Sequence, residues 1–217
     1  MTYMVTGGAG FIGSNFLHFL RKRTDEEIVV IDNLTYAADL RFIPRSQQFK
    51  FEWCDITNEE HVHFLFEKYA PRKIWHFAAE SHVDNSITNY RPFLESNVVG
   101  TINLLNASLN MGIEKFHHIS TDEVYGSLEY DDIELFTEDT PYNPRNPYSA
   151  SKAASDHYVK TWHNTYDLPY LITNCSNNYG RHQHEEKLIP KIIKRAMKDN
   201  ITYMYGGGQQ IRDWLSV

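Results

Sequence analysis

The feature that most constrains this chain is a glycine-rich loop close to its first residue. A β-rich segment at residues 3–6 runs into Gly-Gly-Ala-Gly-Phe-Ile-Gly at residues 7–13, and a segment of helical period continues to residue 23. Glycines here let the backbone turn tightly between a strand and a helix and approach a pyrophosphate at the helix N-terminus. A turn that only packs a helix against a strand is the alternative interpretation. The neighbouring residues decide between the two.

An acidic residue ends the next strand-like segment, residues 28–32. Asp32 follows Gly13 by 19 residues, a spacing at which a carboxylate accepts hydrogen bonds from the ribose hydroxyls of a dinucleotide. The same charge repels a ribose phosphate, so the sequence favours NAD over NADP. Arg41 and Arg45 keep NADP open as an alternative. Together, the loop, the helix and the acid predict a dinucleotide site.

Short β-rich segments alternate with longer segments of helical period along the whole chain. Strands are expected at residues 3–6, 28–32, 50–54, 73–78, 115–120 and 170–175. Helices are expected at residues 11–23, 58–69, 92–110, 147–166 and 185–199. This rhythm predicts an α/β fold, a doubly wound parallel sheet of the Rossmann type with helices on both faces. Residues 209–217 begin a new pattern without a cap or turn, so we expect the chain to be truncated there.

Charge and composition restrict the partners. The chain has 21 basic and 28 acidic residues and a formal charge of -7, which argues against a broad surface for nucleic acid or anionic membranes. An anionic small molecule needs only a few well-placed donors. The longest apolar runs, such as residues 28–31, are far shorter than the roughly 20 residues of a spanning helix, and the chain begins directly with a strand-like segment. We therefore expect a cytoplasmic protein.

The cysteines and histidines of the sequence do not have the spacing of metal ligands. Cys54 and Cys175 lie at the ends of apolar strand-like runs, where small buried thiols are the usual role. Three histidine pairs are present, at positions 61 and 63, 117 and 118, and 182 and 184. No carboxylate or cysteine stands beside them at ligand spacing. The sequence therefore predicts neither a disulfide nor a bound metal.

A second chemical pattern is Asn-Pro-Tyr-Ser-Ala-Ser-Lys at residues 146–152. Asn146 and Pro147 are typical of a helix cap and of the first helical position. Tyr148 and Lys152 then share one helix face. The ammonium and the positive helix end both favour the phenolate form of Tyr148, which would suit a general base. A chance surface pair is the alternative, and Ser-Thr-Asp-Glu at residues 120–123, at the end of a predicted strand, counts against it.

Several motifs together resemble one family. They lie at residues 6–13, 78–84, 120–126, 147–152, 173–180, 186–190 and 210–215. They are similar to motifs of the dTDP-glucose 4,6-dehydratases, which are nucleotide-sugar dehydratases of the extended short-chain dehydrogenase/reductase family. Arg181 and Ser216 depart from that family's usual proline and tyrosine. The resemblance implies an NAD-binding Rossmann domain at residues 1–180 with the catalytic residues, and the start of a truncated substrate-binding domain at residues 181–217.

The resemblance also implies a reaction, the conversion of dTDP-glucose to dTDP-4-keto-6-deoxyglucose and water by an NAD-dependent lyase. Tyr148 would remove the proton of the C4 hydroxyl while hydride passes to NAD, with Thr121 bonded to that hydroxyl and Lys152 holding the ribose. Glu123 would then take the C5 proton, and Asp122 would protonate the departing C6 hydroxyl. Hydride finally returns to C6. A solvated turn is the alternative for the acidic pair.

The expected ligand contacts rest mainly on the resemblance. Cofactor contacts are expected from Gly7, Gly10, Phe11, Ile12, Gly13, Asp32, Asn33, Leu34, Thr35, Asp55, Ile56, Phe77, Ala78, Ala79, Ser81, Ser96, Tyr148, Lys152 and Asn178. Substrate contacts are expected from Ser81, Thr121, Asn177, Lys187, Leu188 and Arg212. Asn97 is expected to hold the active-site backbone, with a polar helix face as the alternative. For Asp55 a turn is as good an interpretation as an adenine contact, and His82 is expected to be structural.

Two other functions stay open. A nucleotide-sugar epimerase shares the fold, NAD, Thr121, Tyr148 and Lys152, but it needs no acid and base for dehydration, so Asp122 and Glu123 count against it. An NAD-binding chain without turnover is the other, because the absent part should supply much of the nucleotide pocket. The expected partners are a small nucleotide-sugar substrate and a second copy of the chain, the latter through residues 92–110 and 147–166.

Overall fold

A single parallel sheet forms the centre of the molecule, which is described by a computed structural model at residues 1–129, 135–198 and 205–217. Its strands are β1 (Thr2–Thr6), β2 (Glu27–Asp32), β3 (Phe49–Trp53), β4 (Lys73–His76), β5 (Lys115–Thr121) and β6 (Tyr170–Cys175). They lie in the order β3-β2-β1-β4-β5-β6, and every neighbouring pair is parallel. The chain order reverses between β1 and β4, where open α/β sheets bind ligands. The predicted doubly wound fold is confirmed.

Helices cover both faces of this sheet. Among the described residues, the helices of ten or more residues are α1 (Phe11–Leu20), α2 (Glu59–Tyr69), α5 (Thr101–Met111) and α6 (Pro147–Tyr166). Along β2, Ile28 and Val30 pack with Leu17 of α1, whereas Val29 and Ile31 join the core below α2, α5 and α6. This alternation follows from the two-residue repeat of a strand. Burying a side chain such as Leu17 contributes about 1.5–3 kcal/mol.

The helix expected at residues 92–110 has an irregular first half. It consists of α4 (Arg91–Phe93), a π-helical segment η2 (Leu94–Gly100) and then α5. A Cβ at Gly100 would lie 2.5 Å from Cγ1 of Ile56, so this part of the helix packs directly against the turn between β3 and α2. Helical period in the sequence does not distinguish a π segment from an α-helix, and such segments are frequent at functional sites.

Several short elements were not expected. They are α3 (Val83–Thr88) and the 3-10 turns η1 (Leu40–Phe42), η3 (Asp122–Tyr125) and η4 (Tyr205–Gly208). The helix expected at 185–199 is α7 (Leu188–Ala196), which begins later because the backbone at Lys187 is still extended; Asp199 lies outside the described residues. The predicted strand ends differ from the observed ones by at most two residues, and β6 matches at both ends.

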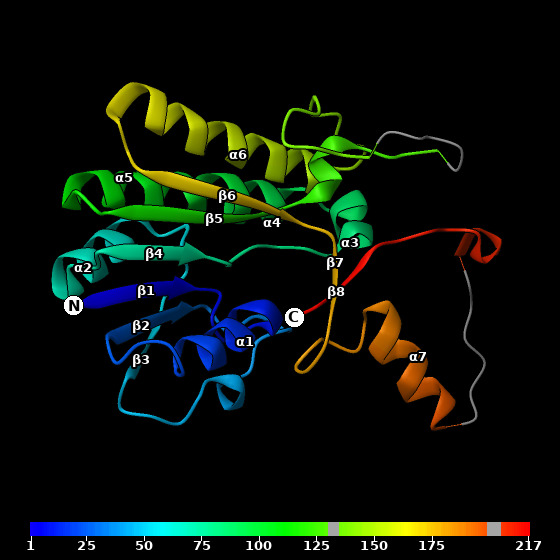
Figure 1. Ribbon diagram of the computed structural model, residues 1–217, viewed down its shortest axis with the longest axis horizontal. Coiled ribbons are helices and arrows are strands. Elements are labelled where there is room, and N and C mark those ends of the chain that lie inside the picture. The colour runs from blue at the N-terminus through cyan, green and yellow to red at the C-terminus, as the bar shows by residue number, and fades with distance from the viewer. Residues whose placement is uncertain (130–134, 199–204) are drawn as a thin grey trace.

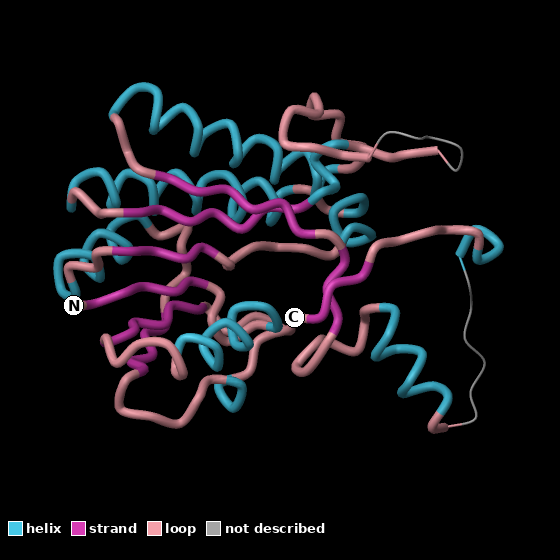
Figure 2. Tube along the Cα trace, viewed as in Figure 1, coloured by secondary structure: helices cyan, strands magenta, loops and turns pink. Residues whose placement is uncertain are grey.

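A second, two-stranded sheet pairs β7 (Asn177–Tyr179) with β8 (Trp214–Ser216). β8 lies within residues 209–217, where the sequence shows a new pattern. This small sheet, α7 and the carboxyl ends of the six strands lie at one end of the molecule, opposite the N-terminus (Figure 1). Figure 2 shows the loops that follow these strand ends at the same side. Within the described ranges, no helix has both the length and the apolar character needed to cross a bilayer.

Candidate active site

The glycine-rich loop lies between the end of β1 and α1, where close contacts exclude side chains. Gly7 has a φ of 68°, and a Cβ there would lie 2.5 Å from the backbone nitrogen of Ala78. A Cβ at Gly13 would lie 2.2 Å from the carbonyl oxygen of Gly7. Both positions therefore need glycine. Gly10 caps α1 without a side-chain bond, and the first residues of α1 line a pocket, which is an arrangement suited to a phosphate.

Asp32 ends β2 and organises the loops around it. Its carboxylate accepts hydrogen bonds from the backbone nitrogens of Ala9 at 3.0 Å and Leu34 at 2.8 Å. Burial raises its pKa, and the two backbone bonds act in the opposite direction. Each oxygen keeps acceptor capacity for a ribose hydroxyl. Arg41, which kept NADP open, is paired with Asp39 through a 2.9 Å bond from its Nε.

The predicted start of α6 is present and holds part of the acidic pair. Asn146 Oδ1 accepts a bond from the backbone nitrogen of Ser149 at 2.8 Å, and its Nδ2 donates to Oε2 of Glu123 at 3.2 Å. Thr121 Oγ1 donates to Asp122 at 3.3 Å and accepts from the backbone nitrogen of Glu123 at 3.2 Å. One helix cap and one threonine thus fix the two acids beside each other.

The two acids differ in their surroundings. Burial, and then the charge of Glu123, raise the pKa of Asp122. Glu123 instead accepts a hydrogen bond from the amide of Asn146. The two adjacent carboxyl groups therefore stand in different environments, as an acid and a base with separate roles would require.

The expected phenolate form of Tyr148 is not supported by its surroundings. Burial, followed by the charge of Glu123, raises the pKa of this phenol, and a hydrogen bond with Thr121 opposes the rise only in part. Lys152 does not offset it because its Nζ donates to the carbonyl oxygen of Ile119 at 2.9 Å and lies 3.3 Å from Nε2 of His118. Sharing a helix face places the lysine near the tyrosine but does not aim its ammonium at the phenol oxygen.

Asn97 fastens the segment after β4 to α6, as expected for a residue that holds the active-site backbone. Its side chain accepts from the nitrogen of Glu80 at 2.8 Å and donates to the carbonyl oxygen of Glu80 at 3.0 Å. It also donates to Oγ of Ser151 at 2.8 Å, which in turn donates to the carbonyl oxygen of Tyr148 at 2.6 Å. Asn97 is buried within the π segment.

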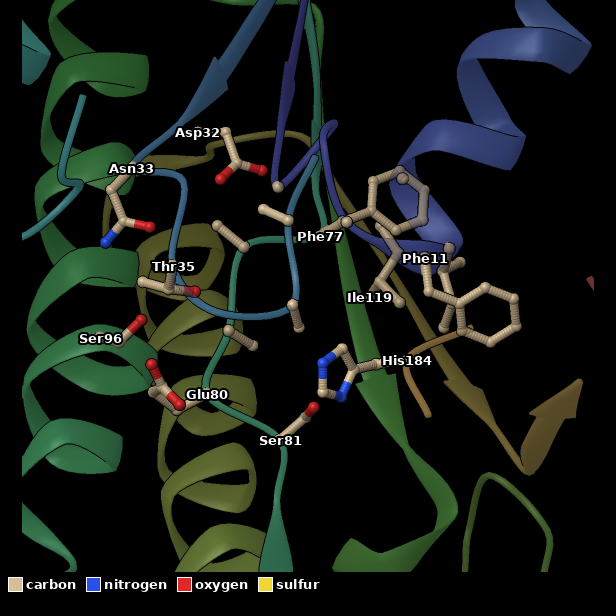
Figure 3. Close-up of a pocket in the computed structure, with 18 of the residues that line it drawn as sticks. Phe11, Asp32, Asn33, Thr35, Phe77, Glu80, Ser81, Ser96, Ile119 and His184 are labelled. Carbon is tan, nitrogen blue, oxygen red and sulfur yellow. The ribbon is translucent and has the colours of Figure 1, made fainter. Parts of the chain in front are cut away.

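Most of the expected ligand residues line one pocket (Figure 3), with Asp32 and Asn33 at one end and Ser81 and His184 at the other. Lining residues among those expected are Gly7, Gly10, Phe11, Ile12, Gly13, Asp32, Asn33, Thr35, Ile56, Phe77, Ala78, Ala79, Ser81, Ser96, Tyr148, Lys152 and Lys187. Lining residues not expected are Ile31, Ala37, Ala38, Cys54, Ile119, Ser120, Cys175, Gln183, His184 and Glu186.

Other expected residues lie outside the lining. These are Leu34, Asp55, Thr121, Asp122, Glu123, Asn177, Asn178, Leu188 and Arg212. Oδ1 of Asp55 accepts from the nitrogen and the hydroxyl of Thr57, which is the turn interpretation. Asn178 donates to the carbonyl oxygen of Ser176 at 2.9 Å, and Arg212, exposed, donates to that of Ile211 at 2.6 Å. Their ligand roles stay predictions.

The loop between β7 and α7 lines one side of the pocket. The predicted pattern of strands and helices did not reveal this. Glu186 accepts a 3.0 Å bond from the hydroxyl of Tyr36 and lies 3.6 Å from Nε2 of His82. Lys187 donates to the carbonyl oxygen of Ser81 at 3.2 Å, and burial lowers its pKa. In the sequence, the family motif at residues 186–190 was the feature that pointed to this loop. His82 also caps α3, consistent with a structural role.

Candidate metal ligands are not gathered. Within the ranges that the structure covers, no three histidine, cysteine or acidic side chains are placed to hold an ion. Cys54 and Cys175 are free thiols. His182 instead stacks on Phe42, with ring centroids 4.2 Å apart.

Fold and site together define a Rossmann-type domain with a dinucleotide pocket and a tyrosine, a lysine and two acids beside it. The chain belongs to the family described as GDP-mannose 4,6 dehydratase, whose model matches residues 4–217. It is 48% identical to the dTDP-glucose 4,6-dehydratases of Haemophilus influenzae and Salmonella typhimurium, over 100% of this chain and 68% and 65% of those proteins. The chain thus spans about two thirds of the length of these relatives.

Solved structures agree with this assignment. A dTDP-glucose 4,6-dehydratase from Streptomyces venezuelae, crystallised with NAD, superposes with a TM-score of 0.94 at 40% identity, covering 100% of this chain and 68% of the other. A UDP-glucose 4-epimerase from Thermotoga maritima gives 0.91 at 27% identity, covering 100% and 69%. The fold is therefore common to dehydratases and epimerases, and the site must distinguish them.

Proposed function

We propose that this chain carries the NAD site and the catalytic residues of a dTDP-glucose 4,6-dehydratase, and that residues 181–217 begin its substrate-binding part. The observation that carries the proposal is the acidic pair beside Tyr148, with Asp122 in surroundings that favour its protonated form and Glu123 held by the Asn146 cap. The relatives at 48% identity support the substrate.

NAD fits the pocket because the loop at Gly7 and Gly13 excludes side chains, while Asp32 offers acceptors for ribose hydroxyls. Lys152 would hold the second ribose. When bound, NAD accepts hydride from C4 of the sugar and returns it to C6.

The remaining steps are proton transfers by residues of this chain. Tyr148 takes the proton of the C4 hydroxyl, and Thr121 orients that hydroxyl. The new C4 ketone acidifies the C5 hydrogen, which Glu123 removes. Asp122 donates a proton to the C6 hydroxyl as it leaves as water. Glu123 then returns a proton to C5 as C6 is reduced. Before the next turnover Tyr148 releases the proton it took from the C4 hydroxyl, and Asp122 takes one up.

The experiment that tests this function is mass spectrometry of the sugar nucleotide after incubation with NAD. With dTDP-glucose we expect a product lighter by one water, because elimination removes the C6 hydroxyl. An epimerase would leave the mass unchanged, and the structural likeness to UDP-glucose 4-epimerase makes UDP-glucose the matched second substrate. An unchanged mass together with an inverted C4 centre would contradict the proposal.

The surface of η2 and α6 supports a homodimer as part of this proposal. The two segments pack together, and Leu94, Val99, Tyr158 and Tyr166 are 39–50% exposed on them. Covering this apolar area with a second copy would remove it from water. We expect light scattering to report twice the chain mass, and Val99→Glu to report the single mass. A wild-type protein that stays monomeric at high concentration would show that this surface has another role.

We also place the reaction in the cytoplasm. NAD and nucleotide-activated sugars are made there, and Cys54 and Cys175 as free thiols fit a reducing compartment. Cell fractionation that recovers the activity elsewhere would contradict this.

A further inference from the structure

A cluster of buried ionisable groups contacts Lys152 outside the lining of the pocket. His118 of β5 and Asp156 of α6 have no exposed surface, and Lys152 is 3% exposed. Nε2 of His118 lies 3.3 Å from Nζ of Lys152 and 3.2 Å from Oδ1 of Asp156. One ring nitrogen therefore stands next to both an ammonium and a carboxylate. The reaction described above uses neither His118 nor Asp156.

The hydrogen bonds of the cluster indicate where its protons lie. In the described part of the chain, neither Nδ1 of His118 nor Oδ1 of Asp156 has a hydrogen-bond partner, although this oxygen lies 3.2 Å from Nε2 of His118. Nε2 also lies within hydrogen-bond distance of Lys152 Nζ, at 3.3 Å, and of Ser155 Oγ, at 3.2 Å. A proton on Nε2 faces this carboxylate oxygen and leaves Nδ1 as a bare acceptor, which costs less than a buried N–H without an acceptor. The imidazole is then neutral, and burial, with the charge of Lys152, lowers its pKa to about 4.

With a neutral His118, Asp156 is the negative charge that balances Lys152. Burial lowers the pKa of Lys152 to about 8, and the carboxylate of Asp156 opposes that change. Other titratable groups near the ammonium are Cys175 of β6 and, behind His118 with ring centroids 5.2 Å apart, His76 of β4. His76 is itself fully buried, and its pKa is well below the ordinary value. Cys175 raises the pKa of Lys152 less than Asp156 does, and a neutral imidazole supplies no compensating charge.

The carboxylate is itself held firmly and is connected to the pocket. Its Oδ2 accepts from Oγ of Ser120 at 2.8 Å and from the hydroxyl of Tyr142 at 3.0 Å. Ser120 lines the pocket directly before Thr121. The groups described above around Lys152 come from β4, β5, β6 and α6. Among the described groups that act on Lys152, Asp156 is the only carboxylate.

We propose that Asp156, bridged by His118, is a positioning residue that keeps Lys152 charged and directed toward the dinucleotide. The proposal rests on the proposed role of Lys152 in holding the NAD ribose. An uncharged amine at this place would lose about half of its strength as a donor to the ribose hydroxyls. The cluster would therefore set the upper end of the pH range in which NAD binds.

The test measures the protonation of Lys152 without any ligand. In protein labelled with 13C at the lysine ε carbons, the resonance that disappears in Lys152→Arg is expected to titrate near pH 8 in the wild type. In Asp156→Asn the midpoint should fall by about one pH unit or more, because the balancing charge is gone. Tyr142→Phe is the matched control: it removes one bond to the same carboxylate and keeps the charge, so the midpoint should not move.

A second readout is the affinity for NAD between pH 6 and pH 10. Wild-type affinity should fall above about pH 8, and in Asp156→Asn the fall should begin about one unit lower. If NAD binds but Asp156→Asn leaves both midpoints in place, the role of Asp156 is refuted and the proposed function stands. If NAD does not bind while the Lys152 midpoint moves, the proposed function fails alone. Should Asp156→Asn not fold, a wild-type Lys152 that titrates above pH 10 would itself overturn the inference.

Discussion

The enzyme carrying Tyr148→Phe should lose C4 oxidation while it keeps its fold and its NAD. Only the phenol oxygen is removed, and the ring position against Phe93, with centroids 6.3 Å apart, is retained. Loss of a general base lowers the rate of a proton-transfer step by about 10²–10⁴. Formation of NADH absorbance in a single turnover with dTDP-glucose measures this step directly. Tyr170→Phe, a change of the same size outside the pocket, is the control.

The pH dependence of the same single turnover has a defined sign. Burial and Glu123 raise the pKa of Tyr148, so the unprotonated base becomes more abundant as pH increases. The rate of NADH formation should therefore rise with pH across the neutral range, until Lys152 loses its proton. A Tyr148→Phe enzyme that forms NADH at a rate close to that of the wild type would remove Tyr148 from the role of base.

Glu123→Gln should separate oxidation from elimination. The substitution keeps the size and an oxygen that can accept from Asn146 Nδ2, which lies 3.2 Å from Glu123 in the wild type, but it removes the base for the C5 proton. NADH and the 4-keto-glucose nucleotide should accumulate, while water loss and solvent deuterium entry at C5 slow by about 10²–10⁴. Mass spectrometry follows both quantities in one reaction.

The matched variant for this experiment is Asp122→Asn. Removing the acid should slow water loss, and the defect should shrink when fluoride replaces the C6 hydroxyl, because fluoride needs less protonation to leave. Dehydration at the wild-type rate by Glu123→Gln, or an equal defect of Asp122→Asn with both leaving groups, would mean that the acid and base roles are assigned wrongly.

The parts of the site that the sequence predicted correctly are local ones. Each of these parts depends on a few consecutive residues, whose spacing determines the local geometry. They are the loop at Gly7 and Gly13, the end of β2 at Asp32 and the cap at Asn146. The fold followed because the periods of strands and helices are long and regular. Roles that rest on family resemblance, such as that of Arg212, are not settled by this geometry.

What the sequence did not predict depends on contacts between distant segments. Glu186 reaches Tyr36 across 150 residues, and no local period reports such a contact. The direction of the Tyr148 pKa was wrong for a related reason. Helical spacing shows that Lys152 lies one turn away, but only the packed structure shows its Nζ bonded to Ile119.

Asn146 shows that one side chain can be constrained by two unrelated requirements. Capping α6 alone would tolerate aspartate, serine or threonine at this position. Holding Glu123 also requires an N–H donor that reaches the carboxylate, and an aspartate there would instead add a second negative charge. Among the good capping residues, only asparagine offers an amide that meets both needs. Substitutions chosen to stabilise the helix would therefore change the chemistry, so position 146 cannot be optimised for stability alone.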